Sequence, residues 1–142
     1  MVNTIKINVL TLDNGDPIVL DGIRFSACSY IDILIDGINP RSFEDFEDML
    51  IVFPELERSA VKEGKYLIFT CACGVADDGG WDYVNVKRYD DCIEWALTRN
   101  KEYRYKFDRI QYLSEVEKAN REILKLADST LIPENFINPE NI

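Results

Sequence analysis

Two closely spaced cysteines are the residues of this sequence that could most readily bind a metal. Cys71 and Cys73 stand one residue apart in the stretch FTCACG. In a strand they point to the same face, so their thiolates could bind one zinc ion together. A structural zinc site needs four ligands, and the remaining cysteines, Cys28 and Cys92, are isolated in the sequence. We therefore expect buried free thiols, no metal and no cofactor, with zinc at Cys71 and Cys73 as the alternative.

Carboxylates are the second group that could do chemistry. Asp77, Asp78 and Asp82 cluster around a glycine-rich loop, ADDGGWDY. Paired carboxylates can act as acid and base or hold Mg²⁺ or Ca²⁺, but this loop lacks the alternating acidic register of a calcium loop that a glutamate closes. A solvated acidic surface is the simpler interpretation, and a carboxylate-based enzyme of unknown substrate is an alternative.

Composition excludes several classes of protein. The 142 residues contain no histidine, which excludes a Ser-His-Asp triad, a Cys-His pair and any histidine-ligated metal. The formal net charge of −10 would repel phosphate backbones, so we expect no nucleic-acid partner. No apolar run approaches the roughly 20 residues of a membrane helix. The beginning, MVNTIKINVL, has no signal-peptide pattern, so we expect a cytoplasmic protein without a membrane partner.

Alternating apolar and polar residues predict most of the strands. Asn14-Gly15 predicts a hairpin that returns through residues 18–20, and the loop 74–80 should join its two flanking strands as another hairpin. A short strand is also expected near Trp95. The other predicted strands cover residues 4–12, 30–35, 66–71, 81–89 and 103–112.

Two helices are predicted from caps and apolar stripes. Ser42, with Asp45 three residues later, approximates a capping box, and Pro54 should end or bend this first helix. Ser114 and Glu117 form a second capping box. The stripes are Phe43, Phe46, Met49, Leu50 and Phe53 in the first helix, and Val116, Ala119, Ile123, Leu124 and Ala127 in the second, which should end near Asp128.

This order of elements predicts the fold class. Short connections between strands favour antiparallel pairing. We expect one α+β domain over residues 1–142, with a largely antiparallel sheet of about six to eight strands. One mid-chain helix and a C-terminal helix should pack on the sheet, and residues 129–142 should form an extended tail.

A resemblance to a known group of proteins involves the C-terminal half. The stretch FTCACGVADDGGWDYVNV, followed by Trp95 and by YRYKFDRIQYLSEVEKANREIL, resembles small bacterial proteins with a T-C-x-C-G strand end, a tryptophan, and an aromatic strand leading into a C-terminal helix. Those proteins are similar to the immunity-type proteins found beside polymorphic toxins. The chain departs from the pattern at Asp77-Asp78, where a further cysteine would be expected.

The resemblance and the charge together imply a binding function. We expect an immunity protein that neutralises a cognate toxin, a basic protein, by occluding its active site with carboxylates. Trp81 and Tyr83 would act as aromatic anchors. A structural or assembly module that dimerises through a sheet edge is a further alternative. The expected partner-binding residues are Glu44, Asp45, Glu47, Asp48, Asp77, Asp78, Trp81, Asp82 and Tyr83.

Overall fold

The fold is described from a computed structural model, which covers residues 2–11, 18–20, 23–25, 28–47, 49–70, 83–126 and 130–132. The helices are α1 (Phe53–Ser59) and α3 (Arg109–Leu124), and two 3₁₀ turns are η1 (Pro40–Ser42) and η2 (Glu44–Phe46). The strands are β1 (Ile5–Thr11), β2 (Ile18–Leu20), β3 (Ile23–Phe25), β4 (Cys28–Ile35), β5 (Leu50–Ile51), β6 (Gly64–Tyr66), β7 (Phe69–Thr70), β8 (Val84–Arg88), β9 (Cys92–Arg99), β10 (Lys101–Asp108) and β11 (Thr130–Leu131).

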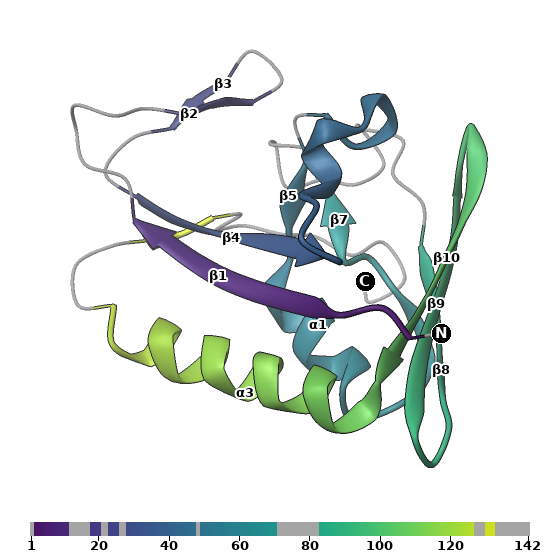
Figure 1. Ribbon diagram of the computed structural model, residues 1–142. Coiled ribbons are helices and arrows are strands. Elements are labelled where there is room, and N and C mark those ends of the chain that lie inside the picture. Colours follow the sequence, from purple (N-terminus) through teal and green to yellow (C-terminus); the bar gives the residue numbers. More distant parts are fainter. Residues whose placement is uncertain are drawn as a thin grey trace.

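The protein has an α+β fold with largely antiparallel sheets, which confirms the predicted class. Strands β10, β9, β8 and β6 form a four-stranded antiparallel sheet. Strands β1, β4 and β11 form a second sheet, in which β11 runs parallel to β4. Strands β2 and β3, and strands β5 and β7, form two-stranded ladders. Helix α1 lies in the middle of the chain, and α3 packs along β1 (Figure 1).

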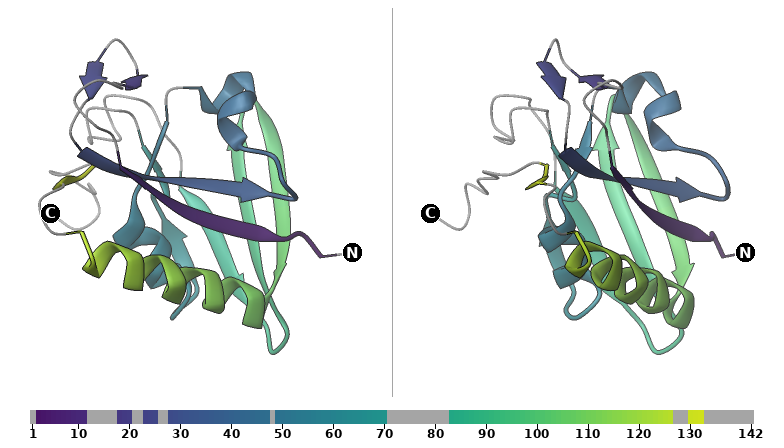
Figure 2. Two further views of the ribbon diagram at one scale, coloured as in Figure 1. Left: turned by 60° about the vertical axis from the view of Figure 1, so that its left-hand side comes forward. Right: turned by 90° about the vertical axis from the view of Figure 1, so that its left-hand side faces the viewer.

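The four-stranded sheet is covered on one face. Figures 1 and 2 show β1, β4 and α3 together on this face, which we call the inner face. No described element covers the other, outer face, which lies on the right in Figure 1. The uncovered face explains why β8 and β9 alternate between buried and more exposed residues.

The alternating isoleucines of β1 and β4 form one side of the core. Ile5 pairs with Ile35 and Ile7 with Ile33, and all four side chains are at most 5% exposed. Because successive side chains of a strand point to opposite faces, this register directs every isoleucine toward the four-stranded sheet and α3.

A short contact links the two sheets. The backbone N–H of Asn3 donates to the carbonyl of Lys106 over 2.6 Å, and the Lys106 N–H donates to the Asn3 side chain over 2.8 Å. Beyond this contact β1 diverges from β10, and α3 lies along the side of β1 that is opposite to β4 (Figure 1). Gln111 of α3 exchanges hydrogen bonds with both backbone groups of Ile5, and Glu115 accepts one from the N–H of Ile7.

A buried polar network joins α1, α3 and β9. The Tyr112 hydroxyl lies 2.6 Å from the Ser59 hydroxyl and accepts a hydrogen bond from the Trp95 indole over 3.2 Å. Ser59 also donates to the carbonyl of Leu56 over 2.5 Å. The three side chains are at most 1% exposed, so these bonds satisfy polar groups that water does not reach.

The sequence predicted a mid-chain helix that begins at Ser42, and this prediction is wrong. Residues 40–46 form two 3₁₀ turns, strand β5 follows, and the helix begins only at Phe53. Pro54 therefore lies in the first turn of α1, where its missing N–H leaves no intrahelical bond unmade. The expected cap residue Asp45 instead accepts hydrogen bonds from the side chains of Asn100 and Tyr103.

The C-terminal helix also begins at a different residue from the predicted Ser114. Strand β10 ends at Asp108, whose carboxylate accepts a hydrogen bond from the N–H of Gln111 and caps α3. Tyr112 thus belongs to the helix and not to the preceding strand. Leu124, predicted to face the core, is 77% exposed.

One predicted strand pairing is wrong, and one predicted strand is divided in two. Strand β1 pairs with β4, whereas residues 18–20 pair with β3. The apolar segment 66–71 is not one strand, because β6 pairs with β8 and β7 pairs with β5. The expected pairing across the loop 74–80 is thus confined to β6 and β8, and that loop lies outside the described residues.

Neither α1 nor α3 is long and apolar enough to cross a membrane, and the described residues include no other helix that could.

Candidate functional site

Three of the predicted binding residues lie together in a turn over the edge of the four-stranded sheet. Glu44 and Asp45 belong to η2, and Glu47 follows it. The side chains of Glu44 and Glu47 are exposed, whereas Asp45 is half-buried and Phe46 is buried. Asp48 lies outside the described residues. We call residues 44–47 the acidic turn.

Asp45 attaches the acidic turn to the hairpin between β9 and β10. Its two carboxylate oxygens accept hydrogen bonds from the Tyr103 hydroxyl and from the Asn100 amide, both over 2.6 Å. These bonds lower the pKa of Asp45. Burial, and then the bond to Asp45, raise the pKa of Tyr103 to about 12. Asp45 is therefore already engaged within the chain, where it holds the acidic turn against the hairpin.

Aromatic contacts hold the same turn from beneath. The Phe46 ring packs between Phe69 and Tyr103, with centroid distances of 5.2 and 4.9 Å. Phe43, just before the turn, stacks on Tyr103 at 6.5 Å. The backbone that carries Glu44 and Glu47 is thus fixed by packing as well as by hydrogen bonds.

The segment leading into the turn is fixed to β4. Arg41 forms an ion pair with Asp32 at 2.7 Å and donates to the Met49 carbonyl over 3.0 Å. Its guanidinium also lies over the Tyr30 ring, 5.3 Å from the centroid. Burial raises the pKa of Asp32, and the Arg41 charge opposes that rise. The sequence patterns did not reveal this contact, although an arginine that shortly follows a strand with a carboxylate is a usable signal.

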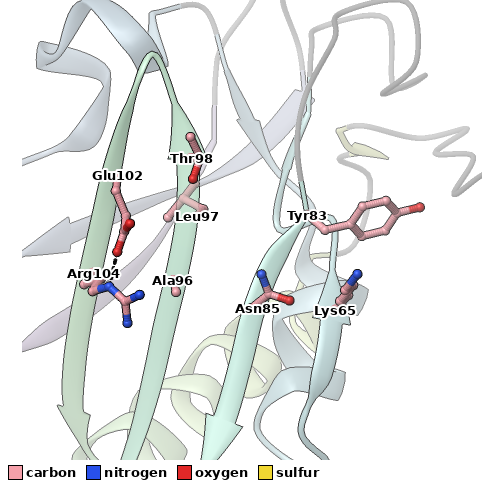
Figure 3. Close-up of a pocket in the computed structure, with 8 residues that line it drawn as sticks. All are labelled: Lys65, Tyr83, Asn85, Ala96, Leu97, Thr98, Glu102 and Arg104. Atoms are coloured by element: carbon pink, nitrogen blue, oxygen red, sulfur yellow. Dashed lines mark hydrogen bonds and ion pairs between the residues drawn. The ribbon is translucent and has the colours of Figure 1, made fainter.

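Tyr83, another predicted binding residue, lies in a different place. It is half-buried and lines a shallow groove of about 440 Å³ on the outer face of the sheet. Figure 3 shows its ring beside the strands that carry Lys65 and Asn85. The acidic turn contacts the inner face through Phe46, so Tyr83 and this turn do not share one surface. The groove is lined by Lys65, Tyr83, Asn85, Ala96, Leu97, Thr98, Glu102 and Arg104.

Charges of both signs occupy this outer face. Cross-strand register places Ala96 between Asn85 and Arg104, so a small side chain forms the floor of the groove. Arg104 and Glu102 form an ion pair within β10. The groove could not be predicted from the sequence, because cross-strand neighbours depend on register.

The other predicted binding residues cannot be placed, since they lie in the range 71–82 outside the described residues. They are Asp77, Asp78, Trp81 and Asp82, together with the alternative zinc ligands Cys71 and Cys73.

The remaining cysteines are buried free thiols. Cys28 begins β4 and Cys92 begins β9, so they belong to different sheets. Burial raises the pKa of both thiols, which keeps them protonated at neutral pH. Within the described ranges, no three Cys, Asp or Glu side chains are close enough together to hold a metal ion.

Comparisons with protein-family models, with curated proteins and with solved structures found no match to this chain.

Proposed function

We propose that the protein is an acidic, cytoplasmic binding protein that neutralises a cognate bacterial toxin by covering the toxin's basic active site. The observation that carries the proposal is the display of Glu44 and Glu47 on a turn that the fold holds in place. The formal net charge of −10 also favours the attraction of a basic partner.

The anchoring of the turn supplies the physical reason. A flexible acidic loop would lose conformational entropy on binding, and that loss would weaken the complex. Here Asp45 and Phe46 are already fixed by Tyr103 and its neighbours, so the two exposed glutamates need little further ordering. They would enter the basic cleft and replace the negative groups of the toxin's substrate.

Association kinetics test the proposal. The probe is the toxin domain encoded next to this gene, immobilised on a surface and measured across a salt series. Because long-range attraction acts mainly on encounter, the association rate should fall as salt rises. Glu44→Lys with Glu47→Lys should lower that rate by about tenfold or more at low salt.

A matched control separates the acidic turn from net charge. Asp90→Lys with Glu122→Lys makes the same change of charge at exposed residues outside the turn, and should change the rate by less than about threefold. Equal effects of the two double variants would assign the attraction to net charge alone. A toxin that neither binds nor is inhibited would refute the proposed function.

A further inference from the structure

We propose that this chain forms a symmetric dimer by pairing strand β10 with β10 of a second copy, in a register in which Glu102 faces Arg104. The pairing would join two four-stranded sheets into one continuous sheet. This inference is independent of the proposed toxin partner.

Strand β10 has an open edge. On one side it pairs with β9 along its whole length, and on the other side Asn3 bonds Lys106 and forms an isolated bridge with Phe107, near the end of the strand. Both backbone groups of Lys106 point away from β9. Because backbone groups alternate in direction along a strand, those of Arg104 and Glu102 point the same way. In the described part of the chain they have no backbone partner on that side.

The charges next to this edge are self-complementary. Antiparallel pairing about a two-fold axis at Tyr103 places Glu102 opposite Arg104 of the second copy, and Arg104 opposite its Glu102. The four outward N–H and C=O pairs then bond across the seam, with facing Cα atoms about 5.5 Å apart. Opposite charges directly across strands stabilise such a pair.

The neighbouring symmetric registers are disfavoured by the same residues. A shift of the axis to residue 102 would place two Glu102 side chains opposite each other, and a shift to residue 104 would oppose two Arg104 side chains. Like charges directly across strands are destabilising. A shift of the axis beyond residue 104 would require Lys106, whose backbone is already bonded to Asn3. A shift beyond residue 102 would meet the turn at Asn100, where β9 and β10 are joined. The register is therefore specified.

An apolar strip accompanies the edge on the inner face. Tyr103 and Tyr105 are half-buried, and Phe43, stacked on Tyr103, is 37% exposed. A two-fold axis at Tyr103 would bring the strips of both copies together, so the dimer would bury apolar area in addition to forming hydrogen bonds.

Sedimentation over a range from about 1 μM to about 1 mM tests the proposal, since small interfaces have dissociation constants in this range. The wild-type chain should dimerise with rising concentration. Glu102→Arg places four arginines at the seam and Arg104→Glu places four glutamates there. Each change should raise the dissociation constant by about tenfold or more.

Charge exchange gives the decisive comparison. The double variant Glu102→Arg/Arg104→Glu should dimerise again, to within about threefold of wild type, because it restores opposite charges. A mixture of the two single variants should form a heterodimer for the same reason. The controls Asp90→Arg and Lys87→Glu make the same changes of charge at exposed residues outside the edge and should leave dimerisation unchanged.

The variants should fold normally. Glu102 and Arg104 are 54% and 72% exposed, and an exposed ion pair contributes little to stability. Circular dichroism and the melting temperature check this. A wild-type chain that is monomeric at every concentration, or a double variant no better than the single ones, would overturn the proposal.

Discussion

Strands β1 and β10 lie close together at Asn3, and each has one side that no described strand covers. The backbone groups on these two sides are treated differently. Within the described residues, each strand forms a ladder with a neighbouring strand on one side only, β1 with β4 and β10 with β9. The free side of β1 is covered by α3, whose Gln111 and Glu115 side chains bond the backbone groups of Ile5 and Ile7. The corresponding side of β10 remains open at Glu102 and Arg104 within the described residues.

The difference shows where this fold can accept another strand. A side chain that takes the place of a missing strand closes an edge, because it leaves no backbone group to pair. Gln111 and Glu115 of helix α3 close the edge of β1 in this way. The helix begins directly after β10, which ends at Asp108. An added strand would therefore find partners on β10 and none at Ile5 and Ile7 of β1.

Hydrogen exchange should show the largest contrast between the two edges. Ile5 and Ile7 are fully buried and their N–H groups are bonded, so their exchange requires a substantial opening of the fold. The N–H groups of Glu102 and Arg104 should exchange at least about a thousandfold faster in dilute solution. Amide exchange followed by NMR measures this directly. Equal protection would show that the two edges are not different.

Removal of the covering side chains should cost the next largest amount. Gln111→Ala and Glu115→Ala each leave a buried N–H of β1 unpaired, so each should lower the free energy of unfolding by about 1–3 kcal/mol. Urea denaturation measures the loss. Glu117→Ala, on the exposed side of α3, serves as a control and should change it by about 0.5 kcal/mol or less. If the double variant Gln111→Ala/Glu115→Ala were as stable as the control variant, the side chains of α3 would not be needed to close the edge of β1.

The point at which the two strands meet should contribute less. Asn3→Ala removes the acceptor for the Lys106 N–H and the donor to Asp36, although water can reach both partners. We expect a loss of about 1 kcal/mol. The pKa of Asp36, lowered by its bonds from Thr4 and Asn3, should rise toward its ordinary value. Urea denaturation and an NMR titration measure the two effects, and an unchanged Asp36 would contradict the assigned contact.

Much of this arrangement follows from sequence patterns, but the edges do not. Alternation correctly predicted β1, β4, β8 and β10, because one face of each strand is buried. The expected short strand near Trp95 is the eight-residue β9. The identity of paired strands depends on contacts between distant segments, and those placed β4 rather than residues 18–20 beside β1. Whether a strand lies at an edge is therefore invisible in its own residues.

The errors in the helices and the site have a related cause. Phe43, Phe46 and Met49 have helical spacing. However, Phe46 packs on Tyr103, and the Asp45 carboxylate accepts a hydrogen bond from the Tyr103 hydroxyl, which is more than 50 residues away in the sequence. These long-range contacts override a local capping signal. The sequence still identified Glu44 and Glu47 as exposed carboxylates, but it could not separate them from the structural Asp45.

The smallest expected effect concerns Tyr103, which joins the open strand to the acidic turn. Its pKa in the folded chain is about 12, above the ordinary value of 10, because burial and the Asp45 carboxylate disfavour the phenolate. The folded state thus holds this proton more tightly than the unfolded state, and the resulting stability is complete below pH 10 and is lost as the pH rises toward 12.

Tyr103→Phe should therefore lose less stability than wild type over this interval. Melting temperatures of both proteins between pH 9 and pH 12 measure the difference, and comparison with the variant removes the contributions of Tyr105 and Tyr112, whose pKa values are also raised. At neutral pH the variant should also loosen the acidic turn, so that the Phe46 ring becomes more mobile while the strands stay paired. Parallel alkaline limbs for the two proteins would show that Tyr103 titrates as an ordinary exposed tyrosine and that Asp45 does not hold it.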